Sequence, residues 1–266
     1  MAAAGTPVVF IHGLWLHADS WGPWVDLFRQ SGYQTTAPGW PGEPGTVEQA
    51  RKQAADVAGY GIQDVVDHYT RIIGNLDGKP IAIGHSFGGL VVQRLLGQDL
   101  AVAGVAIDAA PIKGVLNLPL SALRVASIAL RNPANKKRAV SLTREQFRYG
   151  FGNAISPRES DELYDRWTIP SPGKPLFEAA FAAFSPQSPA KVNTDNTTRG
   201  PLLLTAGGKD HTVPAAITRS TRKLYRHSSA TTDYKEFPDR GHTLALDSRW
   251  REVADAVLAW LREHSL

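Results

Sequence analysis

Short apolar runs alternate with longer amphipathic segments along most of the chain, which predicts strands separated by helices. The predicted strands are residues 7–11, 33–37, 79–84, 102–107, 201–205 and 234–237. The predicted helices are residues 21–30, 62–76, 86–97, 214–225 and 248–263. Strands separated by helices favour parallel pairing through right-handed crossovers. We therefore predict an α/β fold with a mostly parallel, doubly wound sheet of about six strands.

The alternation stops between residues 110 and 198, where the pattern predicts helices and no strand. Thr143–Gln146 and Ser156–Glu159 both fit the capping box that begins a helix, the second with proline at the first helical position. The sequence therefore predicts a core formed by residues 1–109 and 199–266, and a helical insertion formed by residues 110–198.

Ser86 lies at a predicted sharp turn between a strand and a helix. Such a turn forces its backbone toward positive φ, which is strained for a residue with a Cβ, and the hydroxyl then projects from the sheet edge. Gly84 and Gly88 relieve the crowding, because a side chain at either position would strike the strand or the helix. This G-x-S-x-G pattern is typical of a nucleophile elbow, although glycine-flanked serines also occur in ordinary turns.

A nucleophilic serine needs a base, and the base needs a partner that fixes its tautomer. Asp210 and His242 follow the last two predicted strands, and the carboxyl ends of parallel strands meet at one edge. We therefore expect them to lie near Ser86, as acid and base. Taken alone, the aspartate could cap the following helix and the histidine could belong to a surface loop. Asp108, at the end of a strand, and Asp239, close to the histidine, are alternative acids.

Acyl transfer also needs two hydrogen-bond donors for the oxyanion. The amide of Phe87 lies in the first turn of the predicted helix, and the amide of Leu14 follows the His12-Gly13 pair after the first strand. We expect the His12 ring to brace this loop, and the His85 side chain to point away from the nucleophile.

Composition and charge narrow the function classes. The absence of cysteine excludes disulfides, thiolate metal sites and cysteine nucleophiles, and we find no metal-ligand spacing and no phosphate-binding loop, so no cofactor is expected. The net charge of +4 is too small to indicate nucleic acid. No apolar run approaches the roughly 20 residues that span a bilayer, and Met1–Pro7 does not resemble a signal peptide. We expect a cytoplasmic protein with no stable membrane insertion; its oligomeric state is left open.

The positive charge is concentrated between residues 113 and 150, where eight basic residues face one acidic residue, Glu145. One interpretation is a solvated helical face. The other is a positive rim that attracts anionic substrates or a membrane surface. The basic residues are Lys113, Arg124, Arg131, Lys136, Lys137, Arg138, Arg144 and Arg148.

With these motifs the chain resembles the α/β-hydrolase fold family over about residues 7–109 and 199–264. The resemblance implies that the intervening segment is a helical cap. It also implies the following roles: nucleophile Ser86, acid Asp210, base His242, and oxyanion amides Leu14 and Phe87.

The chain departs from the family pattern in three ways. It begins at the position of the family's third strand, so the first antiparallel hairpin is expected to be absent or vestigial. The usual Asp-x-x-Gly-x-Gly after the second strand is replaced by residues 37–42, Ala-Pro-Gly-Trp-Pro-Gly. The nucleophile is serine, which disfavours the aspartate-dependent dehalogenase and epoxide hydrolase activities of this fold.

The expected function is that of a carboxylesterase-like serine hydrolase that cleaves a small-molecule carboxylic ester or lactone through an acyl-enzyme. Four aromatic residues are expected to line the substrate pocket: Trp15, Trp40, Phe147 and Trp167. Perhydrolysis without a cofactor, and thioester, amide or C–C bond hydrolysis, remain open with the same triad. So do a non-catalytic receptor and an interfacial lipid hydrolase whose basic stretch 113–150 acts as a membrane-facing lid.

Overall fold

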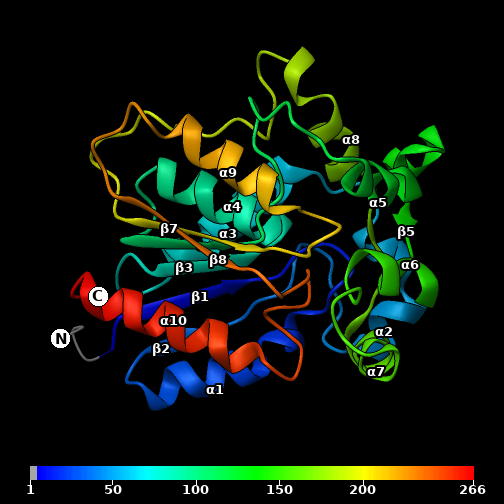
Figure 1. Ribbon diagram of the computed structural model, residues 1–266, viewed down its shortest axis with the longest axis horizontal. Coiled ribbons are helices and arrows are strands. Elements are labelled where there is room, and N and C mark those ends of the chain that lie inside the picture. The colour runs from blue at the N-terminus through cyan, green and yellow to red at the C-terminus, as the bar shows by residue number, and fades with distance from the viewer. Residues whose placement is uncertain (1–4) are drawn as a thin grey trace.

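Six parallel strands form one sheet at the centre of the molecule (Figure 1), as the sequence predicted. The computed structural model describes residues 5–266, so the expectation about a signal peptide falls largely on residues 1–4, outside the described residues. The spatial order is β2-β1-β3-β4-β7-β8. The strands are β1 (Pro7–Ile11), β2 (Gln34–Thr36), β3 (Ile81–His85), β4 (Ala103–Ile107), β7 (Leu202–Gly207) and β8 (Thr232–Phe237).

The register of the strands brings their carboxyl ends together. Ile11 of β1 lies beside Gly84 of β3, and Ile107 of β4 lies beside both His85 of β3 and Thr205 of β7. The loops after β1, β3, β4 and β7 therefore begin at one edge of the sheet. Ligands of open parallel sheets bind at this edge, so the fold itself places the candidate residues in one region.

Helices cover both faces of the sheet (Figure 1). Each face is sealed by a separate buried apolar cluster, which gives three layers. In the part of the chain that the structure describes, no helix is long and apolar enough to cross a bilayer. One face carries α3 (Ile62–Gly74), α4 (Phe87–Gly97) and α9 (Ala215–Leu224), and the other carries α1 (Gly22–Gln30) and α10 (Trp250–Glu263).

Aromatic packing holds α1 against the sheet. The Phe10 ring of β1 lies 5.1 Å from Trp21 and 5.4 Å edge-on from Phe28, measured between ring centroids. Trp24 stacks on Phe28 and donates its indole N–H to the carbonyl of Ala245 at 2.9 Å. This hydrogen bond ties the aromatic cluster to the loop after β8, which carries His242.

The segment between β4 and β7 is mainly helical and lies beyond the carboxyl end of the sheet, at the right of Figure 1. The capping box at Thr143 is reciprocal, because Gln146 returns its side chain to the Thr143 amide. At Ser156 only half of the box forms, because Glu159 instead accepts from the Ser248 amide. The limits at residues 110 and 198 stay a prediction. The helices are α5 (Leu120–Leu130), α6 (Arg144–Gly150), α7 (Pro157–Trp167) and α8 (Lys174–Ala180).

The expectation that this segment holds no strand was wrong. Two short strands, β5 (Ala139–Val140) and β6 (Ser171–Pro172), pair in antiparallel register. Two residues are too few to leave a period in the sequence, and contacts with Trp15 support the pair: its indole N–H donates to Val140 O and its amide to Ser171 Oγ. Five other short elements were also not predicted. They are the helix α2 (Val47–Lys52) and the 3₁₀ helices η1 (Ala18–Trp21), η2 (Ala54–Val57), η3 (Pro133–Lys137) and η4 (Ala182–Phe184).

A methyl group at Gly88 tests the close approach between the elbow and β1. A Cβ there would lie 2.0 Å from the carbonyl oxygen of Ile11, whereas a Cβ on Gly74, at the end of α3, would meet nothing within 4 Å. We expect Gly88→Ala to lower the free energy of unfolding by at least about 3 kcal/mol through overpacking. Gly74→Ala should leave it unchanged or raise it by up to about 1 kcal/mol. Equal denaturant midpoints for the two variants would contradict the close approach.

Candidate active site

Ser86 lies at the tip of a strained turn between β3 and α4. Its φ is 56°, in the left-handed region that side chains disfavour. Its amide donates to Ile107 O at 2.9 Å and its carbonyl accepts from the Ala110 amide at 2.9 Å, so the neighbouring β4 holds the conformation in place. A Cβ on Gly84 would lie 2.3 Å from Gly88 O, which explains both glycines. This is the elbow geometry that the sequence predicted.

The loop after β1 touches the elbow directly. A Cβ on Gly13 would lie 2.7 Å from the Cβ of Ser86. The amide of Trp15 donates to the Ser171 hydroxyl, whereas the amide of Leu14 has no acceptor among residues 5–266. Phe87 begins α4, so its amide has no acceptor within the helix. Two amides near Ser86 thus remain able to donate to a ligand.

A buried ion pair lies behind this loop. His12 Nε2 lies 3.0 Å from Glu43 Oε2, and both side chains are almost fully buried. His12 Nδ1 donates to Gly13 O at 2.9 Å, and the indole of Trp40 donates to His12 O at 3.0 Å while lying against the ring. The ring thus braces the loop, as expected.

The charges of this pair depend on each other. Burial acts to lower the pKa of His12, but the Glu43 carboxylate outweighs burial and raises it above 6.5. Burial likewise acts to raise the pKa of Glu43, but His12 outweighs it and lowers that pKa below 4.5. Each member of the pair therefore favours the charged form of the other.

His242 and Asp210 meet at the carboxyl ends of β7 and β8. His242 Nδ1 donates to Asp210 Oδ2 at 2.6 Å, and Asp210 Oδ1 accepts from the amides of Thr212 and Val213 at 2.6 and 2.8 Å. Burial acts to raise the pKa of Asp210, but His242 and these hydrogen bonds hold it below 3.8. His242 Nε2 is buried with no hydrogen-bond partner in the described part of the chain. The carboxylate thus fixes the tautomer that leaves Nε2 as a proton acceptor.

Neither alternative acid takes this position. Asp239 is about half exposed and pairs with Arg249 at 2.5 Å. Asp108 is fully buried; its Oδ1 accepts from the Gly207 amide at 2.7 Å, and its Oδ2 lies 3.9 Å from His242 Nδ1, too far for a hydrogen bond.

The Asp108 carboxyl is a protonated partner of Asp210. Burial, followed by the charge of Asp210, raises the pKa of Asp108 well above 3.8. Two adjacent buried carboxyls cannot both ionise, so one retains its proton. Because the pKa of Asp108 is the raised one, Asp108 is the carboxyl that keeps the proton.

His85 supports the base, a contact that the sequence did not reveal. Its Nε2 donates to the backbone carbonyl of His242 at 2.9 Å, and the two ring centroids lie 4.5 Å apart. Burial, with a further contribution from His242, lowers the pKa of His85 well below 6.5, so the ring is neutral. Phe151 lies edge-on to the His242 ring, with centroids 4.7 Å apart. The base therefore packs against two rings.

The same side chains offer the donor types of a metal site. Ligand atoms of His85, Asp108 and His242 lie within 4.8 Å of one another. Each side chain, however, already has a protein partner: a carbonyl for His85, the Gly207 amide for Asp108, and Asp210 for His242. These pairings account for the cluster without a metal ion.

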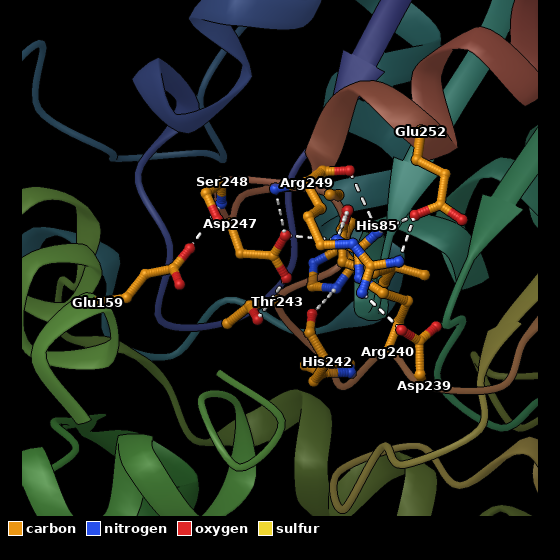
Figure 2. A network of polar contacts seen from close by, with 12 residues as sticks. His85, Glu159, Asp239, Arg240, His242, Thr243, Asp247, Ser248, Arg249 and Glu252 are labelled. Atoms are coloured by element: carbon orange, nitrogen blue, oxygen red, sulfur yellow. Dashed lines mark hydrogen bonds and ion pairs between the residues drawn. The ribbon is translucent and has the colours of Figure 1, made fainter. Parts of the chain in front are cut away.

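Figure 2 shows the polar network that holds the loop carrying His242. Arg240 and Asp247 form a fully buried ion pair within this loop, and Arg240 Nη1 also contacts Glu252 Oε2 of α10 at 3.1 Å. The Thr243 hydroxyl donates to Asp247 at 3.1 Å. On the other side, Glu159 of α7 accepts from the Ser248 amide at 2.6 Å. The loop is thus fixed both to the core and to the inserted segment.

A mainly apolar hollow of about 100 Å³ opens beside Ser86. Its floor includes Trp15, Ser86 and Phe87, and its walls come largely from α5 and α8 of the inserted segment. The wall residues are small or aliphatic, so they leave space rather than fill it. On α5 and α8 they are Ala122, Leu123, Val125, Ala126, Leu130, Leu176, Ala179 and Ala180.

Three of the four predicted pocket aromatics do not line this hollow. Trp40 packs on His12 behind the loop after β1, and Phe147 is buried in a stack with Phe151, at a centroid distance of 5.0 Å. Trp167 lines a separate depression between α7 and the loop after β8. Their aromatic character reflects packing, whereas only Trp15 lies beside Ser86.

A profile of the alpha/beta hydrolase family matches residues 8–256. The chain belongs to the alpha/beta hydrolase family. The comparison with curated proteins gave no significant match.

Solved structures share the alpha/beta hydrolase fold over nearly the whole chain. A monoacylglycerol lipase from Paleococcus ferrophilus is 23% identical with a TM-score of 0.68, covering 98% of this chain and 97% of that one. An extracellular alpha/beta-hydrolase from a Paenibacillus species, described as homologous to tobacco salicylic acid binding protein 2, is 20% identical with a TM-score of 0.68, covering 96% and 98%. A methylesterase from Arabidopsis is 16% identical with a TM-score of 0.66, covering 97% and 99%.

The buried pair of this alpha/beta hydrolase should make its stability depend on pH. Because folding raises the pKa of His12, its protonated ring stabilises the fold below pH 6.5. This contribution is lost as the pH rises through the pKa of the folded state. Because folding lowers the pKa of Glu43, its carboxylate stabilises the fold above pH 4.5. This contribution is lost as the pH falls through the pKa of the folded state. Both contributions are therefore fully present between these two pH values.

Replacing Glu43 tests this window. Glu43→Gln should lower the free energy of unfolding by about 3 kcal/mol near pH 5.5, and by progressively less at alkaline pH. Glu48→Gln removes an exposed carboxylate paired with Lys52 and should change stability little. Denaturant titrations at several pH values measure both. A loss for Glu43→Gln that does not vary with pH would contradict the ion pair.

Proposed function

We propose that the chain is a serine hydrolase that cleaves carboxylic esters or lactones through an acyl-enzyme. The 2.6 Å hydrogen bond between His242 Nδ1 and Asp210, next to the strained turn at Ser86, carries this proposal. An ionised acid, a base of fixed tautomer and an outward-turned serine in this chain order are the parts that nucleophilic acyl transfer needs.

In the proposed mechanism, Ser86 Oγ attacks the carbonyl carbon while His242 Nε2 takes its proton. Asp210 stabilises the imidazolium that forms. The amides of Leu14 and Phe87 donate to the oxyanion, where the loss of one donor typically costs about 10²–10³ in rate. His242 then gives the proton to the leaving alkoxide, and the same ring activates the water that hydrolyses the acyl-enzyme.

Asp108 has a supporting part in this scheme. A neutral Asp108 adds no second negative charge beside His242, and its carboxyl limits the directions in which the neighbouring Asp210 carboxylate can turn. We therefore assign the acid to Asp210 and a positioning role to Asp108.

The hollow supports a substrate with an apolar acyl or aryl group of medium size. Its walls present methyl and methylene groups from α5 and α8, and none of its lining residues is charged. The similar structures include, by their titles, a monoacylglycerol lipase, a methylesterase and a pyrethroid hydrolase, and these names agree with this substrate class.

Removing the Ser86 hydroxyl is the direct test. Ser86→Ala should lower kcat on p-nitrophenyl esters of graded chain length by at least about 10³ while leaving the fold intact. Ser127→Ala, an exposed serine on α5 outside the hollow, is the matched control and should keep full activity. An active Ser86→Ala enzyme would refute the assignment, and ligand binding by a wild-type protein without turnover of any ester would favour a receptor.

Two isosteric variants distinguish the acids. Asp210→Asn should reduce kcat by about 10⁴, because an amide cannot stabilise the imidazolium and can favour the wrong tautomer. Asp108→Asn keeps a neutral side chain beside Asp210 and an acceptor for the Gly207 amide, so its kcat should stay within about tenfold of wild type. Comparison of the two kcat values, with unfolding curves for each variant, shows which aspartate is the acid. A larger loss for Asp108→Asn would overturn the assignment of Asp210 as the acid.

A further inference from the structure

Large apolar side chains are exposed in one region of the described chain. The most exposed are Leu120 and Phe184, each at 84%. Single exposed apolar residues are common on protein surfaces, but a gathering of them marks an interaction site. We call this set the apolar rim: Leu116, Leu118, Leu120, Leu123, Phe181 and Phe184.

The apolar rim adjoins the hollow beside Ser86. Leu118 and Leu123 line the hollow themselves, as does Ala180, directly before Phe181. The two stretches that form the rim are also joined, because Lys113 Nζ donates to Ser185 O at 2.6 Å, and α5 packs against α8. A ligand entering from the rim therefore passes between these two stretches toward the serine.

Excess positive charge lies beside the rim, where the charge of Lys136 also interacts with Glu178. No acidic residue occurs between Asp108 and Glu145. Lys136 borders a depression that Phe181 also lines. The acid at that depression, Glu178, is turned to the Ile62 amide at 2.6 Å. Four exposed cations at the C-terminal end of α5 and on the segment that follows make no ion pair with any residue in 5–266: Arg131, Lys136, Lys137 and Arg138.

Six of the eight basic residues form two groups, while Lys113 donates to Ser185 O and Arg124 lies over the Tyr149 ring. Arg144 and Arg148 pair with Asp165 and Asp161 of α7, so they belong to a solvated helical face. The four cations before them have no such partners, so they remain available to an anionic surface.

We propose that the apolar rim and these four cations form a peripheral docking surface for a bilayer that contains anionic phospholipids. The leucine and phenylalanine side chains enter the boundary between headgroups and acyl chains, and the cations contact the anionic headgroups. Docking in this orientation points the entrance of the hollow at the lipid, so an apolar ester moves from the bilayer to Ser86 without crossing water. The docking itself is independent of catalysis, whereas the lipid-borne substrate rests on the proposed function.

Charge favours this occupant over a second copy of the chain. A partner molecule would present the same four cations at the same rim, and like charges brought together oppose association. An anionic bilayer offers apolar depth and opposite charge together, which matches both features of the surface.

Flotation with vesicles tests the docking without hydrolysis. The Ser86→Ala protein is mixed with vesicles of phosphatidylcholine and phosphatidylserine, or of phosphatidylcholine alone. We expect it to float with the anionic vesicles at least about tenfold more than with the neutral ones, and to be released by high salt. Absence from the anionic vesicles would overturn the docking surface.

Two pairs of substitutions locate the surface. Leu120→Ser with Phe184→Ser should abolish flotation, and Lys136→Gln with Lys137→Gln should remove the preference for anionic vesicles. Arg71→Gln with Lys79→Gln removes the same charge near the amino end of β3, away from the rim, and should float as before. Equal losses from both charge-neutralised proteins would show non-specific attraction and overturn the proposal. So would a dimer in sedimentation that the rim variant converts to a monomer.

Activity separates this proposal from the proposed function. In the wild-type background the rim variant should lose hydrolysis of a long-chain ester dissolved in vesicles and keep that of a water-soluble acetate ester. Flotation without hydrolysis of either ester would refute the esterase and leave the docking standing. Hydrolysis of the acetate ester without flotation would refute the docking surface and leave the esterase standing.

Discussion

The close approach of two backbone segments determines the rest of the site. The elbow after β3 fits against the end of β1 only because Gly88 has no side chain, since a Cβ there would meet Ile11 O at 2.0 Å. That contact sets Ser86 beside the loop of Leu14, and the strain at Ser86 is held by hydrogen bonds to β4. The nucleophile and its oxyanion donors are therefore one packing unit.

Two buried ion pairs stabilise the loops around this packing unit. The loop after β1 rests on the His12–Glu43 pair, and the loop after β8 rests on the Arg240–Asp247 pair (Figure 2). Each pair is satisfied by several hydrogen bonds, without which a buried charge would be destabilising. Around His242 the charge is kept to a single carboxylate. A second ionised group there would compete for the ring proton.

The sheet and the elbow could be predicted because they depend on local patterns. Apolar runs located the buried strands β1, β3, β4 and β7, and glycine spacing located the turn at Ser86. Side-chain environments could not be predicted, because they depend on contacts between distant segments. Aromatic character placed Phe147 in the pocket, yet it packs on Phe151, and nothing in the sequence showed that Asp108 would meet Asp210. The two-residue strands in the inserted segment were also too short to leave a period.

The central claim is that Ser86 is activated by the Asp210–His242 pair. Reaction with a fluorophosphonate, followed by peptide mass spectrometry, tests it most directly, because a phosphonyl adduct forms on an activated serine and does not turn over. The account predicts one adduct per chain, on Ser86, and much slower labelling of the same serine when His242 is replaced by Gln. An adduct on another residue, or labelling that does not depend on His242, would contradict it.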